Sequence, residues 1–232
     1  TLARQYCLPM CLCRAYHICY PARVLDRRWV LGGILLAGGI GLVTAIRRRP
    51  RLTEHSRLFL FGDSMAQGLD PHLKALSKEA GIPYFAAAAQ GTRIDQWASS
   101  HKLVSYLSDF QPTITLVALG TNDAYMSGNV WEKQVPHMEA LLKKLREFSN
   151  ANVNDAPGPH YSAGTEIVWI GPPSLGPYGG RAPNSEFLAA LAEHAPHYFD
   201  SAGYEIPRGP DGLHPSAAGF AGWAGRIWSH LS

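Results

Sequence analysis

Short apolar runs alternate with amphipathic segments from about residue 57 to the end of the chain. Runs with the length of buried strands lie at 58–61, 82–88, 113–119, 166–170 and 198–200. Segments whose apolar positions recur with helical spacing lie at 72–80, 130–148, 185–194 and 216–231. Strands that alternate with helices predict right-handed βαβ units. We therefore expect an α/β fold, a three-layer α/β/α sandwich with a central, mostly parallel five-stranded sheet.

Turn-forming residues set the expected limits of these elements. Asp70 and Pro71 are expected to begin the first helix and Gly81 to end it, while Ser216 is expected to cap the last helix. Two long turn-rich stretches, 150–164 and 171–184, are predicted to be loops, the second at the rim of the sheet.

The first part of the chain has a different pattern. Residues 29–46 form an uncharged apolar run that would be about 27 Å long as a helix. This length suits a transmembrane anchor or a signal segment, with a possible cleavage site at 43–45, and the three arginines at 47–49 favour the anchor. Small residues at Gly33, Ala37 and Gly41 would allow weak self-association of such helices.

These features divide the chain into four parts. Residues 1–28 are expected to be a basic, cysteine-containing extension, disordered or non-native, and 29–46 the anchor or signal segment. Residues 47–56 are predicted to be a basic linker and 57–232 the folded domain. The folded domain is expected to be extracytoplasmic, either membrane-anchored or secreted. Basic residues flank both ends of the apolar run, which leaves its orientation open.

Charge and cysteine content narrow the possible functions. Residues 1–54 hold nine Lys or Arg and two Asp or Glu, a balance of +7, whereas the rest of the chain has a balance of −4. The folded domain therefore lacks the basic surface that nucleic-acid binding requires. All four cysteines lie in the first nineteen residues, in no zinc-ligand pattern. We expect no metal and no cofactor.

A serine directly follows the first strand, where packing alone does not call for one. Ser64 lies in the stretch FLFGDSMAQG, and ligand sites of open parallel sheets form at the carboxyl ends of their strands. A serine becomes a nucleophile when a histidine takes its proton and a carboxylate orients that histidine. Asp211 and His214, in the stretch GPDGLHP, offer both groups before the last helix.

Two further positions at the same predicted edge could stabilise a negatively charged oxygen. Gly91 follows the second strand, and Asn122 follows the third. The backbone N–H groups of Ser64 and Gly91 and the side-chain amide of Asn122 would supply three donors to a tetrahedral intermediate. A histidine base also predicts that the rate falls in acid, because a protonated imidazole accepts no proton.

Together, these stretches resemble the SGNH hydrolases, also called GDSL esterases and lipases. The matching blocks are Gly62-Asp63-Ser64, Gly91, Gly120-Thr121-Asn122-Asp123 and Asp211-Gly212-Leu213-His214-Pro215, and the resemblance extends over about 57–232. It implies a flavodoxin-like fold, with Ser64 as nucleophile, His214 as base and Asp211 as orienting carboxylate. Met65 stands where the name-giving motif has leucine, a change that conserves volume.

The resemblance leaves several substrates and functions open. We expect a short-chain ester, such as an acetyl group on an envelope glycan, with a lysophospholipase or thioesterase as the alternative. An O-acyltransferase would use the same triad, and a non-catalytic binding module is the least favoured reading. Candidate substrate contacts follow the motif blocks and lie in the rim loop: Arg93, Ile94, Trp97, Tyr125, Trp131, Tyr178 and Arg181.

Overall fold

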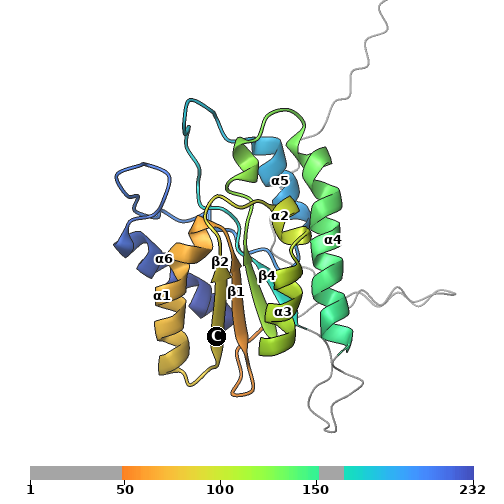
Figure 1. Cartoon of the computed structure of the whole chain (residues 1–232). Helices are drawn as coiled ribbons and strands as arrows, with labels where there is room; N and C mark the ends of the chain where they lie inside the picture. The colour runs from red at the N-terminus through yellow and green to blue at the C-terminus, as the bar shows by residue number, and fades with distance from the viewer. Residues whose placement is uncertain (1–48, 152–164) are drawn as a thin grey trace, which may run out of the picture. The chain divides into compact units, whose positions relative to one another are not determined.

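The structure is a computed structural model that describes residues 49–151 and 165–232. Its core is a parallel sheet of β1 (Leu58–Gly62), β2 (Tyr84–Ala88), β3 (Ile114–Ala118) and β4 (Glu166–Trp169). The strand order is β2-β1-β3-β4, and every pairing is parallel (Figure 1). All four strands therefore end at the same edge of the sheet.

Helices cover both faces of the sheet, as the three-layer prediction requires. One face carries α1 (Ser64–Glu79) and α6 (Ala217–Leu231), and the other carries α2 (Ile94–Ala98), α3 (His101–Phe110), α4 (Val130–Ala151) and α5 (Ser185–His194) (Figure 1). The alternating strand residues explain the two layers: Leu58 and Leu60 of β1 pack toward α1 and α6, and Phe59 and Phe61 pack toward the opposite helices. Both faces of β1 are fully buried.

Two helices agree with their predictions, one in its bounds and one in its cap. α5 spans Ser185–His194, as predicted, and Ser216 accepts a hydrogen bond from the N–H of Gly219 at the start of α6. The prediction for the first helix was wrong, because α1 begins at Ser64 rather than at residue 72. Asp63 caps it by accepting from the N–H of Met65, and Pro71 lies on the exposed side within the helix.

The fifth predicted strand does not form as a strand. Phe199 makes a single parallel bridge with Ile170, beside the end of β4. Its N–H donates to the carbonyl of Trp169 at 2.8 Å, and its carbonyl accepts from Gly171 at 3.0 Å. Within the described residues the sheet therefore has four strands and one added bridge, because the pairing of 198–200 ends after one residue.

Two helices were missed at the sequence level. α2 and α3 lie between β2 and β3, where no helix was predicted. α3 had a visible signal, since the Ser100 side chain accepts from the N–H of Leu103, and Leu103 and Leu107 are buried one turn apart. The helix places these two leucines in the cluster around Phe59 and Phe61.

The predicted extension and apolar segment, residues 1–28 and 29–46, lie outside the described residues, as does most of the predicted loop 150–164. Among the helices that the structure describes, none has the length and apolar character needed to cross a bilayer.

Candidate active site

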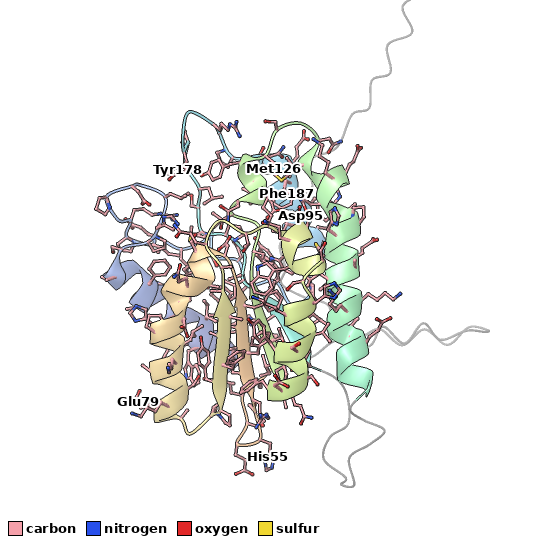
Figure 2. The ribbon with its side chains drawn as sticks, in the orientation of Figure 1. His55, Glu79, Asp95, Met126, Tyr178 and Phe187 are labelled. Carbon is pink, nitrogen blue, oxygen red and sulfur yellow. The ribbon has the colours of Figure 1, made fainter. Side chains whose placement is uncertain are left out.

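The predicted nucleophile lies where β1 passes into α1. Ser64 is the first residue of α1, directly after the N-cap Asp63. Gly62 permits this sharp turn, since its φ is +157° and a Cβ there would lie 2.0 Å from the carbonyl oxygen of Ala118. The backbone therefore places Ser64 at the carboxyl edge of the sheet. Figure 2 shows Tyr178, Met126 and Asp95 at this end of the molecule, and His55 and Glu79 at the other.

The structure brings the three predicted catalytic side chains together. Nε2 of His214 lies 2.9 Å from Oγ of Ser64, although 150 residues separate them in the chain. Nδ1 of the same imidazole lies 2.5 Å from Oδ2 of Asp211. This is the arrangement in which an imidazole can take the serine proton while a carboxylate fixes its tautomer.

Asp211 is held as a carboxylate by its hydrogen bonds. Its pKa lies below the ordinary value, chiefly because of the hydrogen bond from the His214 side chain and also because of that from the His214 backbone. Oδ1 accepts from the N–H groups of Leu213 and His214, both at 3.0 Å. The Asp211 side chain is 41% exposed and that of His214 is 28% exposed. The backbone turn, rather than burial, therefore orients this pair.

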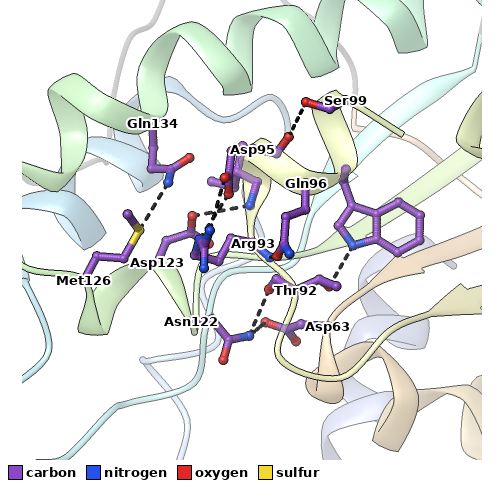
Figure 3. A network of polar contacts seen from close by, with 12 residues as sticks. Asp63, Thr92, Arg93, Asp95, Gln96, Ser99, Asn122, Asp123, Met126 and Gln134 are labelled. Carbon is purple, nitrogen blue, oxygen red and sulfur yellow. Dashed lines mark hydrogen bonds and ion pairs between the residues drawn. The ribbon is translucent and has the colours of Figure 1, made fainter. Parts of the chain in front are cut away.

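Asn122 joins a network of polar contacts that includes the buried Asp63 and Asp123 (Figure 3). Its Nδ2 donates to Oδ2 of Asp63 at 3.1 Å and to the carbonyl of Thr92 at 2.9 Å. Each hydrogen of the amide thus has an acceptor within the protein. To donate to a substrate oxygen, Asn122 must share one of these hydrogens or release one acceptor.

Two buried carboxyl groups belong to this network. Burial raises the pKa of Asp63 to about 7, and the charge of Asp123 adds to the increase. Burial likewise raises the pKa of Asp123 to about 7. Oδ1 of Asp123 accepts from the N–H of Ile94 at 3.3 Å, and its Oδ2 is buried without a hydrogen-bond partner among the described residues. Both groups are thus shifted toward their protonated forms near neutral pH.

The two backbone donors predicted for the oxyanion hole differ from Asn122. The N–H groups of Ser64 and Gly91 donate to no other group in the described part of the chain. Gly91 has a φ of +72°, a left-handed conformation that glycine adopts without strain. Both N–H groups therefore remain available to a ligand.

Four predicted substrate contacts keep accessible surface. Arg93 pairs with Asp95 at 3.1 Å and is 36% exposed. Tyr178 is 44% exposed and lies across from Tyr125, with ring centroids 6.0 Å apart. Tyr125 donates its hydroxyl to the carbonyl of Gly176 at 2.6 Å, and Arg181 donates to the carbonyl of Tyr125 at 3.4 Å. The rim loop is thereby tied to the segment that follows Asn122.

Of the other predicted contacts, Ile94 and Trp97 are buried and Trp131 is partly buried. Ile94 is fully buried, and Trp97, 7% exposed, packs on Phe61 and donates its indole N–H to Oγ1 of Thr92 at 2.9 Å. Trp131 packs against His194, with ring centroids 4.8 Å apart. Ile94 therefore packs in the core, with no accessible surface for a substrate, whereas Trp97 also lines a cavity along β2 and its substrate role stays a prediction.

A separate cavity of about 480 Å³ lies along the edge strand β2. Its lining includes Ala86, Ala88, Thr92 and Tyr106, but none of the three catalytic candidates. In the described ranges 49–151 and 165–232, no group of three His, Cys, Asp or Glu side chains is placed to hold a metal ion.

Sequence reasoning missed one polar residue beside the site. Arg208 donates from Nη1 to the carbonyl of Leu213 at 2.6 Å and from Nη2 to the carbonyl of Ser174. Its position three residues before Asp211 was the only signal available from the sequence.

Comparisons with known proteins identify the family of the chain. A model of the GDSL-like lipase/acylhydrolase family matches residues 60–221, which is more than half of the chain. The chain belongs to this family. A search of the curated proteins found no match.

Several solved structures share the GDSL-type fold. A carbohydrate acetylesterase family member from Sinorhizobium meliloti is 20% identical, with a TM-score of 0.53, and the match covers 75% of this chain and 96% of that one. The psychrotrophic esterase EstA from Pseudoalteromonas is 19% identical, with a TM-score of 0.53 and coverage of 76% and 96%. A mutant acetylxylan esterase, Axe2 from Geobacillus stearothermophilus, is 13% identical, with a TM-score of 0.50 and coverage of 78% and 96%. At these identities the likeness shows the fold.

Proposed function

We propose that this GDSL-family chain is a serine esterase that removes short acyl groups, acetyl above all, from a glycan through an acyl-enzyme on Ser64. The observation that carries the proposal is the hydrogen-bonded chain from Ser64 Oγ through the His214 imidazole to Asp211, with separations of 2.9 Å and 2.5 Å. A nucleophile, its base and the orienting carboxylate are then all present.

The geometry supports a two-step reaction. Nε2 of His214 accepts the proton of Ser64 as Oγ attacks the ester carbonyl carbon, and the carbonyl electron pair moves to oxygen. Asp211 stabilises the imidazolium that forms. When the tetrahedral intermediate collapses, the alcohol leaves with the proton from His214. A water molecule then repeats the sequence on the acyl-enzyme, releasing the carboxylic acid and restoring Ser64.

The free backbone donors support the same reaction. The N–H groups of Ser64 and Gly91 would bind the oxygen on which negative charge develops, a term worth about 3–4 kcal/mol per donor in enzymes of this type. Asn122 would add a third donor by sharing a hydrogen now bound to Asp63 or Thr92.

The aromatic rim supports a glycan as the alcohol part. Tyr178 presents an exposed ring beside Tyr125, and tyrosine rings pack well against the apolar faces of sugars. Two structurally similar proteins are described as a carbohydrate acetylesterase and an acetylxylan esterase. We expect Tyr178→Ala to raise KM for an acetylated polysaccharide and to leave p-nitrophenyl acetate turnover unchanged. Equal KM values on the polysaccharide would contradict the glycan role.

Two measurements test the proposed reaction: turnover of esters with different acyl lengths, and turnover after Ser64 is replaced. The chain should hydrolyse p-nitrophenyl acetate faster than the decanoate, and Ser64→Ala should lower kcat by at least about 10³-fold. Ser229→Ala, which removes an exposed hydroxyl on α6, is the matched control. An organophosphonate should label Ser64 once per chain. Full activity in Ser64→Ala would refute the nucleophile, faster decanoate cleavage would favour a lipase, and acetyl transfer to a sugar in place of acetate release would identify an acyltransferase.

A further inference from the structure

Arg208 connects two segments that form the proposed site. It precedes the turn that carries Asp211 and His214, and its Nη1 donates to the carbonyl of Leu213 inside that turn at 2.6 Å. Its Nη2 donates to the carbonyl of Ser174, which lies in the loop between β4 and α5. That loop also holds Tyr178, the exposed aromatic residue of the rim. One guanidinium therefore bridges the catalytic turn and the substrate-side loop.

The turn is otherwise closed mainly on itself. Arg208 and Pro215 form an antiparallel bridge, and the N–H of Gly209 donates to the carbonyl of His214 at 2.8 Å. The N–H of Gly212 donates to the carbonyl of Gly209 at 3.1 Å. These bonds define the internal shape of the turn, and the buried Leu213 anchors its middle in the core, whereas Arg208 supplies the hydrogen bond to the β4–α5 loop.

The catalytic pair itself adds little to hold the turn in place. Asp211 and His214 are 41% and 28% exposed, and exposed ion pairs contribute little to stability. Charged donors to carbonyl oxygens are stronger than neutral ones, and a planar guanidinium can bind two carbonyls at once. Burial lowers the pKa of Arg208, and the nearby Tyr125 and Asp211 oppose that change. The cation is therefore partly enclosed between the turn and the rim.

We propose that Arg208 is a positioning residue that fastens the Asp211–His214 turn to the β4–α5 loop and thereby keeps the imidazole within reach of Ser64. Its guanidinium donates to the carbonyls of Leu213 and Ser174, and not to Ser64 or His214, so it acts through the turn. The kinetic part of this inference rests on the proposed function, whereas the structural part does not.

The kinetic test removes the bridge and keeps the rest of the triad. Arg208→Ala should lower kcat on p-nitrophenyl acetate about 10- to 100-fold and change KM little, because a misplaced base affects the chemical step more than it affects binding of a small ester. Arg208→Lys should be intermediate, since one ammonium cannot span both carbonyls as a guanidinium does. The matched control is Arg146→Ala, an exposed arginine of α4. Wild-type kcat in Arg208→Ala would overturn the proposal.

Chemical rescue separates positioning from a general loss of structure. Arg208 borders a cavity of about 390 Å³, which leaves a path for a small cation to the site of its side chain. Millimolar guanidinium should restore kcat of Arg208→Ala several-fold, with no gain for the wild type or for equal concentrations of sodium chloride. A loss of kcat that guanidinium does not restore, together with a lower melting temperature, would assign Arg208 a purely structural role and overturn the proposal.

Hydrogen exchange tests the bridge without any turnover. The backbone N–H groups of Gly209 and of residues 211–214 should exchange faster in Arg208→Ala than in the wild type, while those of β1 and β3 should not change. If Ser64→Ala keeps full activity, the proposed function fails, and faster exchange in the turn still supports the bridge. Unchanged exchange in the turn would refute the bridge whatever the activity.

Discussion

Asp211 and the pair formed by Asp63 and Asp123 lie at the same edge of the sheet, but their environments are opposite. Asp211 is 41% exposed and is held by two backbone N–H groups and an imidazole, which lower its pKa. Asp63 and Asp123 are fully buried, and burial raises the pKa of each to about 7. The carboxyl that the proposed reaction needs in its charged form is thus partly exposed, and the two that hold the scaffold are buried in the core.

The difference suggests a division of labour along the edge. In the proposed reaction, Asp211 would act through its charge, which stabilises the adjacent imidazolium. Asp63 holds neighbouring groups in place, because its side chain caps α1 and accepts a hydrogen bond from the amide of Asn122. The comparison predicts that mutations of Asp211 change rate more than stability. It also predicts that mutations of the buried pair change both, in a manner that depends on pH.

The largest expected effect is on rate. Asp211→Ala should lower kcat about 10³- to 10⁴-fold, because His214 loses the partner that fixes its tautomer. The melting temperature should change little, since the side chain is exposed. Steady-state kinetics and a thermal melt measure the two effects, with Asp109→Asn, an exposed aspartate of α3, as control. A rate within threefold of the wild type would remove Asp211 from the triad.

The second effect is the pH dependence of stability. Folding raises the pKa of a carboxyl such as Asp123 from 3.8 to about 7, so the carboxyl stabilises the fold while it is protonated. This contribution is fully present below pH 3.8 and is lost as the pH rises from 3.8 to about 7. The slope is about 1.4 kcal/mol per pH unit for each such group. The free energy of unfolding should therefore fall between pH 4 and 7, more steeply in the wild type than in Asp123→Asn.

Asp123→Asn has a second consequence that sharpens this test. Its new amide N–H₂ would occupy the place of Oδ2, which has no partner among the described residues, at a cost of about 1–3 kcal/mol at every pH. The variant should be less stable than the wild type at pH 5, and the gap should shrink or reverse at pH 8. Urea unfolding at both pH values measures it. Parallel curves would show that Asp123 is ionised in the folded state at neutral pH.

The third effect concerns Asn122. Asp63→Asn retains an oxygen for the N–H of Met65 but sets an amide N–H₂ against that of Asn122, so the Asn122 side chain should turn away. We expect kcat to fall about 100-fold, the lower end of the range for losing one donor to an oxyanion. Asp63→Ser, which keeps an acceptor for the helix cap, is the comparison. If Asp63→Asn retains full kcat, then the tether of Asn122 has no part in catalysis.

The parts of this edge that could be predicted from sequence are those with local signals. Ser64, Asp211 and His214 follow from motif residues at the ends of strands, and α5 follows from its apolar spacing. The start of α1 was predicted wrongly because Pro71 resembles a helix start, whereas the cap at Asp63 was hidden within the serine motif. The fifth strand was predicted wrongly because an apolar run does not show how many of its residues will pair with a neighbouring strand.

The remaining features depend on contacts between distant positions. The amide of Asn122 meets Asp63 across 59 residues of sequence, and Arg208 meets the carbonyl of Ser174 across 34. Backbone carbonyls carry no sequence signature, so no pattern of side chains marks Arg208 as a bridge. Burial of Trp97 likewise depends on α2 folding against Phe61. These properties required the three-dimensional arrangement.

The smallest expected effect tests whether the partly exposed charges of Asp95 and Arg93 change the pKa of the buried Asp123. The charge of Asp95 raises the pKa of Asp123, and that of Arg93 lowers it. Asp95→Asn removes the negative charge that raises the pKa of Asp123. It also removes the ion pair with Arg93, whose side chain is 36% exposed, and such a pair is worth about 0.2–1 kcal/mol. The pKa of Asp123 should fall slightly, so the drop in stability should begin to level off at a lower pH. Unfolding curves from pH 4 to 8 measure this shift. If the free energy of unfolding changed by much more than about 1 kcal/mol at all pH values, Asp95 would itself be part of the buried network. Solvent exposure alone would then not explain the difference between Asp211 and the buried pair.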